Sequence, residues 1–386
     1  MELAKFCLPV FLSAALCACS DSSNRPRYST APQYDFSAAD SWLGSFVEEE
    51  DAFDGASIII VNTTTGTLHR ASFGNQTPED IVLLASVSKV PSVSLLMALE
   101  NDPAVNFDMD TPIENYLPWS GVYPGISTAQ LVGNISGIPG LFAASRYGPH
   151  LCQYASAGQF PNAEQLQDCA RVIYQTPLEG TVPPGTAFDY GGSQWHLAGA
   201  VAEIVGGDSW NNLFRRYITE PCELEVFEYG NMLFNPSSWA GFPDSLLGRD
   251  NPNIEGGAIS NIDDLGKLLR MHLNDGLCGN NRVIGEQQAQ RMRVDTGTDL
   301  GSREWLNYGR GYGLGWWVPP PEEGKEPSFF DDPGAFGSIS WIDTERGYGA
   351  FVALEQYESL IAASRGPARI VPELIPIIER IMDNPL

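Results

Sequence analysis

The chain has 386 residues, which is enough for one large domain or two modest ones, and its apolar content is ordinary for a globular protein. It carries 48 acidic residues against 22 lysines and arginines, which gives a net charge of −26. A field of this sign repels nucleic acid and anionic membrane surfaces, so neither is an expected partner, and solubility is the simplest role of the charge.

The first segment predicts export. Residues 1–18 contain one lysine, Lys5, and then an apolar run that is too short to span a bilayer and has the form of a signal-peptide core. The run ends in Leu-Cys-Ala-Cys, which resembles the lipobox of bacterial lipoproteins, although Cys17 is unusual inside that box. Cleavage before Cys19 would leave a lipidated cysteine at the new N-terminus, and its acyl chains are the only membrane contact that we expect.

The residues after Cys19 predict where the protein is anchored. Ser20 stands at the position where bacterial inner-membrane retention commonly uses Asp. We therefore expect the periplasmic side of the outer membrane, with secretion or a free periplasmic protein as the alternative. Residues 19–35 are polar and aperiodic, which predicts a flexible tether, and the folded domain is expected to span residues 36–386.

Four cysteines follow this leader, and export places them in an oxidising compartment. Four cysteines allow three pairings, and closing the shorter loops favours Cys152–Cys169 and Cys222–Cys278. The chain has no Cys-x-x-Cys pair and its four histidines are scattered, so we expect neither a metal ion nor another cofactor.

Strand-like patterns lie at both ends of the chain. Residues 56–62 and 66–74 predict one hairpin, and residues 338–344 and 348–356 predict another. Helical patterns occupy residues 91–101, 193–205, 262–274 and 368–383. These elements predict an α+β fold, in which an antiparallel sheet is built from about residues 40–80 and 310–386. A mainly helical region of about residues 95–305 is inserted between the two parts.

A Ser-x-x-Lys motif, Ser86 to Lys89, follows the first hairpin. Pro91 tolerates only the first turn of a helix, so a helix that holds Lys89 must begin close to Ser86. Residues three apart share one helix face, so the hydroxyl of Ser86 and the amine of Lys89 can touch. A lysine whose pKa is lowered can activate a serine nucleophile, and the helix start supplies N–H groups for a developing oxyanion.

The stretch LASVSKVPSVSLLMALE resembles the Ser-x-x-Lys segment of the serine β-lactamase and penicillin-binding-protein superfamily, in particular the group of class C β-lactamases, family VIII esterases and D-aminopeptidases. Later stretches resemble its other landmarks in the same order: LVGNISGIPGL, PPGTAFDYGGSQWHLAGAVAEIVGG, EGGAISNIDDLGKLL, YGLGWWV and DPGAFGSISWIDTERGYGAFVAL. The resemblance covers residues from about 40 to the end. It implies a three-layer sandwich of the β-lactamase type, with helices flanking the sheet.

The resemblance also implies roles for single residues. Ser86 would be the acylated nucleophile, and Lys89 would share and shuttle its proton. Tyr190 would act as general base, as phenolate or proton relay, and would return the proton to the leaving group. The oxyanion hole would be the backbone N–H groups of Ser86 and Ala335, with Ala335 on the strand after Gly334. Gly334 would let the substrate approach the backbone closely.

The sequence departs from the family pattern in its second and third motifs. Tyr-x-Asn is here Tyr190-Gly191-Gly192, so Gly192 takes the substrate-contacting position of the amide, and Ser193 is expected to cap the next helix. Lys-Thr-Gly is here Asp332-Pro333-Gly334, which replaces a cation that would receive a substrate carboxylate by an anion. A histidine of the family is replaced by Asn134, for which we expect only structural consequences.

These features predict a serine hydrolase that forms an acyl-enzyme on small acyl substrates and is esterase-like or amidase-like. A β-lactamase or D-Ala-type peptidase is one alternative, and a non-catalytic envelope binding protein on the same scaffold is another. Residues 143–168 predict a cysteine-tethered loop beside the site that shapes specificity, or a mere surface insertion. The oligomeric state stays open.

Overall fold

The computed structural model describes residues 32–141, 148–233, 235–320 and 323–386. The predicted signal peptide, the lipidation site Cys19 and most of the predicted tether lie outside the described residues. From Gln33 to Leu386 the chain forms one compact unit. None of the helices within the described ranges has both the length and the apolar character that are needed to cross a bilayer.

A seven-stranded antiparallel sheet is built from both ends of the chain, which confirms the prediction. Its spatial order is β2-β1-β12-β11-β10-β9-β8. The first hairpin of the chain pairs with the last, because β1 lies against β12 with Ile59 opposite Phe351. The strands are β1 (Gly55–Asn62), β2 (Gly66–Gly74), β8 (Gly311–Tyr312), β9 (Trp317–Val318), β10 (Phe329–Pro333), β11 (Gly337–Asp343) and β12 (Tyr348–Glu355).

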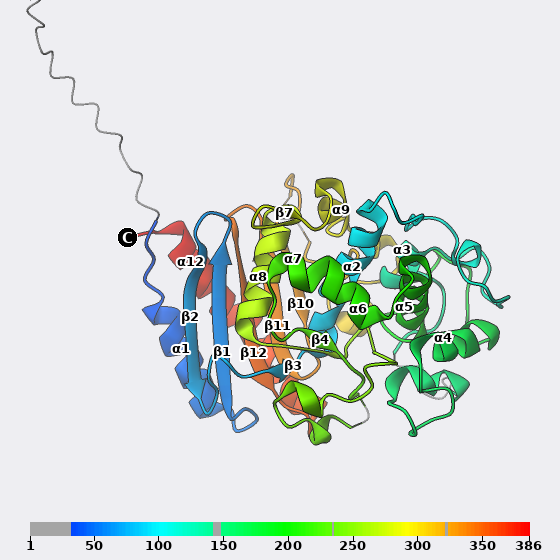
Figure 1. Ribbon diagram of the computed structural model, residues 1–386. Coiled ribbons are helices and arrows are strands. Elements are labelled where there is room, and N and C mark those ends of the chain that lie inside the picture. The colour runs from blue at the N-terminus through cyan, green and yellow to red at the C-terminus, as the bar shows by residue number, and fades with distance from the viewer. Residues whose placement is uncertain (1–31, 142–147, 234, 321–322) are drawn as a thin grey trace, which may run out of the picture. The chain divides into compact units, whose positions relative to one another are not determined.

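Helices cover both faces of this sheet. Side chains of β1 alternate between the faces: Ile58 and Ile60 join a core with α1 (Ser37–Glu49) and α12 (Ile375–Asp383). Ile59 and Val61 join the larger core, which includes residues of α8 (Ile262–Leu273). Figure 1 shows α8 across one face of the sheet and α12 behind the other. Because β1 is buried along its whole length, its sequence is an uninterrupted apolar run.

The helical region is inserted in the sequence between the strands of the two chain ends. Its helix α2 (Lys89–Asn101) is buried from Lys89 to Leu99. A 3₁₀ turn, η1 (Ala85–Ser88), leads into α2. The other helices are α3 (Thr128–Val132), α4 (Leu166–Gln175), α5 (Ser193–Gly206), α6 (Trp210–Phe214), α7 (Glu220–Cys222), α9 (Glu286–Arg291), α10 (Leu360–Ala363) and α11 (Arg365–Arg369).

Shorter elements complete this region. A three-stranded sheet has the order β3-β5-β4, and β6 pairs with β7. These strands are β3 (Val82–Leu83), β4 (Glu228–Tyr229), β5 (Ala258–Ser260), β6 (Leu277–Cys278) and β7 (Asn281–Arg282). The 3₁₀ segments are η2 (Ile113–Asn115), η4 (Gly148–Tyr154), η6 (Pro236–Ser238), η7 (Pro243–Ser245), η8 (Thr298–Leu300) and η9 (Trp305–Asn307), and the π-helical segments are η5 (Arg215–Thr219) and η10 (Ile370–Leu374).

The predicted helices are present, with boundaries that differ by a few residues. The last one, expected at residues 368–383, is divided into α11, the π-helical segment η10 and α12. Pro372 and Pro376 explain the division, because a proline has no N–H to donate to the preceding turn.

Both expected disulfides are present, Cys152–Cys169 and Cys222–Cys278. The first joins η4 to α4, and the second joins α7 to β6. Two disulfides in a chain of this size point to an oxidising compartment.

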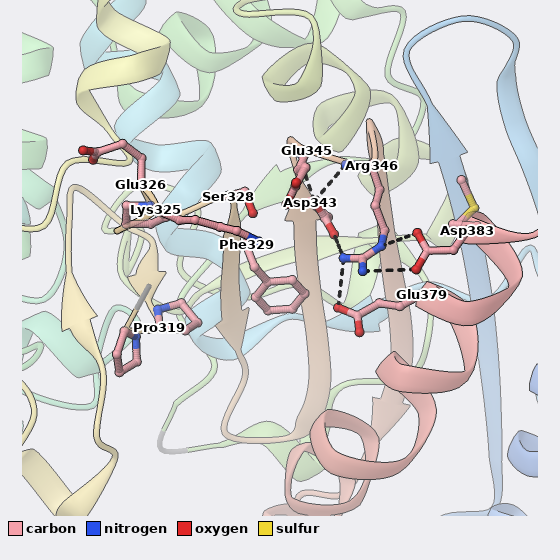
Figure 2. A pocket seen from close by; sticks show the side chains of 13 residues that line it. Pro319, Lys325, Glu326, Ser328, Phe329, Asp343, Glu345, Arg346, Glu379 and Asp383 are labelled. Carbon is pink, nitrogen blue, oxygen red and sulfur yellow. Dashed lines mark hydrogen bonds and ion pairs between the residues drawn. The ribbon is translucent and has the colours of Figure 1, made fainter. Parts of the chain in front are cut away.

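A polar cavity of about 530 Å³ lies beside the sheet, and the tip of the β11–β12 hairpin and the end of α12 contribute to its wall. Figure 2 shows Arg346 in this wall, directed at three carboxylates. Its guanidinium lies 2.8 Å from both Asp343 and Asp383 and 3.6 Å from Glu379. The hydrogen bond to Asp383 raises the pKa of Arg346 more than any other contact does. None of the lining residues is one of the predicted catalytic residues, so the cavity is not the candidate active site.

The Arg346 cluster is expected to stabilise the fold by tying the last hairpin to the C-terminal helix. Arg346→Met should lower the free energy of unfolding by about 1–2 kcal/mol, because the carboxylate of Asp343 is 1% exposed and loses its cation. Urea denaturation checks this value. Arg215→Met is the matched control, since its pair with Glu220 is about 60% exposed on both sides and should contribute less than about 0.5 kcal/mol. Equal losses in both variants would contradict the assignment.

Candidate active site

Ser86 lies in η1, at the entry to the buried helix α2, and its side chain is half-buried. The preceding residue, Ala85, has φ of +46°, a left-handed conformation that is unfavourable for residues other than glycine. This strained residue directs the chain from β3 into the 3₁₀ turn and presents Ser86 at its start. The sequence carried no signal for this strain, because alanine is not a residue that favours positive φ.

Lys89 is the first residue of α2, and its amine contacts the predicted nucleophile. Its Nζ lies 3.2 Å from Ser86 Oγ and donates a second hydrogen bond, 2.8 Å long, to the backbone carbonyl of Glu255. The side chain is 2% exposed. Burial lowers the pKa of Lys89 below its ordinary value of 10.5, while the carboxyl groups of Glu255 and Asp332 act to raise it. A buried amine of this kind can accept the proton of Ser86.

Tyr190 lies on the other side of this amine. Lys89 Nζ stands 4.5 Å from the centre of the Tyr190 ring, over its face, and a hydrogen bond links the side chains of Tyr190 and Ser86. The three predicted catalytic side chains are therefore brought together. Burial raises the pKa of Tyr190 well above 10, and Asp332 raises it further, so the neutral phenol is favoured. Of the two expected forms of Tyr190, phenolate and proton relay, burial favours the relay, because it stabilises the neutral phenol.

An aromatic cluster surrounds Tyr190. The ring of Trp317 stacks on it with centroids 5.2 Å apart, and Trp305 lies 4.7 Å away. Tyr312 meets it edge-on at 5.7 Å, and Tyr308 packs against Trp317. These rings exclude water from the phenol, which is the physical cause of its raised pKa. They come from residues 305–317, more than a hundred positions away, and no sequence pattern linked them to Tyr190.

Asp332 occupies a different position from the one expected. Its side chain is fully buried. Burial raises its pKa well above the ordinary value, although Lys89 and the backbone N–H of Val90 act against this rise. We expected Asp332 to be an anion that faces the substrate, and the structure corrects this. The carboxyl lies inside the protein near Lys89, and burial favours its neutral form.

The Tyr190-Gly191-Gly192 turn needs both of its glycines. Gly191 has φ of +73°, and Gly192 has φ of +84° with ψ of −159°, a conformation open only to glycine. A Cβ atom on Gly191 would lie 2.7 Å from Glu255 Oε2. The carboxyl group of Glu255 therefore occupies the space beside this turn, and Gly192 N–H donates a hydrogen bond of 2.8 Å to the same oxygen.

Two neighbours of the turn have structural roles. Asn134 Oδ1 accepts hydrogen bonds from the backbone N–H of Gly191 at 3.0 Å and from Trp195 Nε1 at 2.8 Å, which agrees with the structural role expected for Asn134. Ser193 does not cap α5 as predicted, because its hydroxyl turns toward His150 Nδ1, 2.9 Å away. Gly192 is the residue at the cap position, and it has no side chain to offer.

The predicted oxyanion hole lies where η1 meets the β10–β11 turn. No carbonyl among the described residues accepts a backbone hydrogen bond from the N–H of Ser86 or of Ala335. Ala335 lies in the turn rather than on a strand, which corrects the prediction: β10 ends at Pro333, and Gly334 N–H bonds back to Ser338. A Cβ atom on Gly334 would lie 2.4 Å from the carbonyl of Leu84, so this glycine lets η1, rather than a substrate, approach the turn closely.

The cysteine-tethered segment packs behind the site. Residues 142–147 lie outside the described residues, but η4 contributes three contacts. His150 and Gln153 hydrogen-bond the hydroxyl of Ser193, and Tyr154 hydrogen-bonds the side chain of Glu255. The described part of this segment therefore supports Ser193 and Glu255 from behind the site. The sequence had assigned no role to Glu255. Glu255 is part of the family-like stretch EGGAISNIDDLGKLL. Its contact with Lys89 could not be predicted, because the two residues are 166 positions apart in the sequence.

The geometry combines a serine hydroxyl, a buried amine and a buried phenol within hydrogen-bond reach, with backbone N–H groups beside them. The beta-lactamase family model matches residues 43–369, most of the chain. The chain belongs to the beta-lactamase family. It is 24% identical over 311 residues to penicillin-binding protein 4 of Amycolatopsis lactamdurans, which covers 75% of each chain. Within the wider superfamily of penicillin-binding-protein-like serine hydrolases, this agrees with the resemblance found in the motifs.

Solved structures share the fold. A putative beta-lactamase from Bacteroides dorei superposes with a TM-score of 0.71 at 22% identity, covering 91% of this chain and 100% of that one. EstCE1, a hydrolase with promiscuous acyltransferase activity, superposes with a TM-score of 0.69 at 16% identity, covering 88% and 96%. The α+β class expected from the sequence, with its antiparallel sheet and flanking helices, is thus that of a beta-lactamase-family protein.

Proposed function

We propose that this beta-lactamase-family protein is a serine hydrolase that forms an acyl-enzyme on Ser86 and acts as an esterase or amidase. The observation that carries the proposal is the 3.2 Å contact between Lys89 Nζ and Ser86 Oγ, with Tyr190 hydrogen-bonded to the same serine. Because burial lowers the pKa of Lys89 and raises that of Tyr190, the neutral amine of Lys89 is the base in acylation.

The reaction proceeds in two steps. Ser86 Oγ attacks the acyl carbonyl while its proton moves to Lys89, and the oxyanion accepts hydrogen bonds from the N–H groups of Ser86 and Ala335. The phenol of Tyr190 gives its proton to the departing oxygen or nitrogen and regains one from Lys89. Water then attacks the ester on Ser86 and gives a proton to Lys89. Lys89 and Tyr190 pass a proton to Ser86 Oγ as the acid leaves.

A fluorophosphonate tests this proposal. It should phosphonylate Ser86 once per chain, as seen by intact mass and by mapping of the modified peptide. Labelling at another serine would contradict the assignment of Ser86. The absence of any labelling, together with the absence of turnover on an ester panel, would favour the non-catalytic binding protein.

The substrate class follows from position 332. A substrate carboxylate about 4 Å from a lysine would gain about 4 kcal/mol at an effective dielectric of 20, and this chain has a buried carboxyl at that position instead of a cation. Uncharged substrates lose no electrostatic attraction when Asp332 stands in place of that lysine. The aromatic cluster around Tyr190 also presents apolar surface close to Ser86. The solved relative EstCE1, a hydrolase with promiscuous acyltransferase activity, supports the same class by analogy.

We therefore expect short-chain neutral esters to exceed benzylpenicillin by at least about 10²-fold in kcat/KM, which parallel assays with p-nitrophenyl esters and the penicillin measure. Asp332→Asn should leave this ratio within about threefold, because the side chain is fully buried and burial raises the pKa of its carboxyl, which disfavours the charged form. Penicillin turnover equal to ester turnover would favour a β-lactamase or D-Ala-type peptidase, the alternative suggested by the likeness to penicillin-binding protein 4. A large rise in penicillin turnover for Asp332→Asn would show that Asp332 is charged and repels the substrate.

We further propose that the protein is exported and anchored by lipid at Cys19 to the periplasmic side of the outer membrane. The signal-like segment and the Leu-Cys-Ala-Cys sequence support this, and the two disulfides agree with export. Mass spectrometry of the mature N-terminus after expression in a Gram-negative host tests it. Diacylglyceryl-modified Cys19 is the expected result, and an unmodified N-terminus beyond Cys19 would contradict it.

A further inference from the structure

Glu255 lies beside the turn in which the family's second motif has lost its side chain. The expected Asn is Gly192, whose backbone conformation excludes every other residue. The carboxyl of Glu255, from the turn before β5, fills the space beside Gly191 and accepts the N–H of Gly192 at 2.8 Å. A carboxyl group from a segment 63 residues further along the chain therefore holds the turn that lacks the amide, from the side of Gly191.

Glu255 also contacts the catalytic amine twice. Its backbone carbonyl accepts a hydrogen bond of 2.8 Å from Lys89 Nζ, and its Oε2 atom lies 3.7 Å from the same nitrogen. Both side chains are almost fully buried, with 2% of Lys89 and 7% of Glu255 exposed. A carboxylate at this distance and burial acts on the amine with little screening by solvent.

We propose that Glu255 is a positioning residue for acylation, which fixes the Gly191-Gly192 turn and stabilises the charged form of Lys89 after it accepts a proton. This inference rests on the proposed function, in which Lys89 accepts the proton of Ser86. An amide at this place would orient groups without changing the charge of the amine. A carboxylate orients the turn and also raises the pKa of the amine. This site should therefore acylate over a different pH range from a site that has an amide.

The groups that face Lys89 set the direction of the effect. Glu255 and Asp332 raise its pKa, burial lowers it, and the remaining titratable neighbour is Tyr190, over whose ring the amine stands. Glu255 is faced by Lys89, Tyr154, Tyr190 and Tyr312. Burial raises the pKa of its carboxyl, and the charge of Lys89 and the N–H of Gly192 act against this rise. Removal of the negative charge at residue 255 therefore lowers the pKa of Lys89, and the fraction of neutral amine at a given pH rises.

The test separates this effect from catalysis. The full chain has four lysines, so selective ¹³C labelling of lysine gives few resonances, and Lys89→Met assigns that of Lys89. Glu255→Gln keeps an acceptor for Gly192 N–H and removes the charge. We expect its Lys89 resonance to titrate at least one pH unit lower than in the wild type. The matched control is Glu203→Gln, since Glu203 is also buried and accepts a backbone N–H, that of Trp210, but contacts none of the catalytic side chains.

An unchanged titration of Lys89 in Glu255→Gln, or an equal shift in Glu203→Gln, would overturn the inference.

Ester turnover gives a second readout. Its pH inflection should move with the Lys89 resonance. Glu255→Ala should lose about 10²-fold more activity than Glu255→Gln, because it releases the Gly192 turn. If Glu255→Gln does not fold, Glu255→Asp keeps the charge but cannot reach Gly192 N–H. Amide exchange of the segment 190–195 should then be at least about tenfold faster, and unchanged exchange would also overturn the inference. Failure of fluorophosphonate labelling in every form would remove the proposed function without touching the titration result.

Discussion

Ser86→Ala is expected to abolish ester hydrolysis and fluorophosphonate labelling while leaving the fold intact. The serine is the only group that the proposed mechanism acylates, and removal of a triad-like nucleophile costs about 10⁴-fold or more in turnover. The substitution is small, and Ser86 is half-buried at a 3₁₀ turn, where alanine is tolerated. Ester assays on enzyme of matched purity measure the loss, and circular dichroism checks the fold.

Ser92→Ala is the control for this experiment. Ser92 lies two turns further along the same segment, and its hydroxyl bonds to Tyr229 and to the carbonyl of Ile254 rather than to a catalytic group. We expect a loss of stability of about 1 kcal/mol and little change in turnover at a temperature where the variant is folded. Wild-type activity in Ser86→Ala would mean that another residue is the nucleophile.

Lys89→Arg is expected to lower turnover by at least about 10²-fold at every pH. A guanidinium keeps the positive charge beside Glu255 but stays protonated up to pH 12 and beyond, so it cannot accept the proton of Ser86. The wild type should gain activity as the pH rises through the lowered pKa of Lys89, because the base is the neutral amine. The arginine variant should show no such limb. The pH profile of kcat/KM measures both expectations.

Tyr190→Phe separates the base from the relay. The phenol favours its neutral form, so its loss should lower the maximum of the profile without removing the limb that belongs to Lys89. If Lys89→Arg retained the limb and Tyr190→Phe lost it, Tyr190 would be the base, as the family resemblance first implied.

The sequence predicted those parts of the site that depend on local spacing. Ser86 and Lys89 share one turn, so their contact followed from helix geometry and the position of Pro91. Tyr190 was found through its motif. Glu255 was missed because it meets Lys89 across 166 residues, and only the folded sheet brings β5 beside η1 and α2.

The orientation of Asp332 could not be predicted from the sequence either. Neighbouring strand residues point to opposite faces, so sequence alone could not say which face Asp332 takes. Asp331 pairs with Arg310 on one side of β10, and Asp332 turns toward Lys89 on the other. The hairpins and the disulfides were predictable, since turn residues and loop lengths determine them, whereas the cluster of Trp305, Tyr308 and Trp317 depends on tertiary packing that leaves no periodic trace.

The pairing of β1 with β12 has a consequence for the time at which the proposed active site can be completed. Strand β1, which comes before Ser86 in the chain, pairs with β12, which begins only at Tyr348, and the turn that carries Ala335 lies before β12. Contacts of such large sequence separation form late and make folding slow. A chain still emerging from the ribosome, or threading through a membrane unfolded, therefore has Ser86 and Lys89 but no completed sheet and no second oxyanion donor. We therefore expect the proposed hydrolytic activity to begin only after the last strand has been released and paired, which would separate synthesis and transport from catalysis.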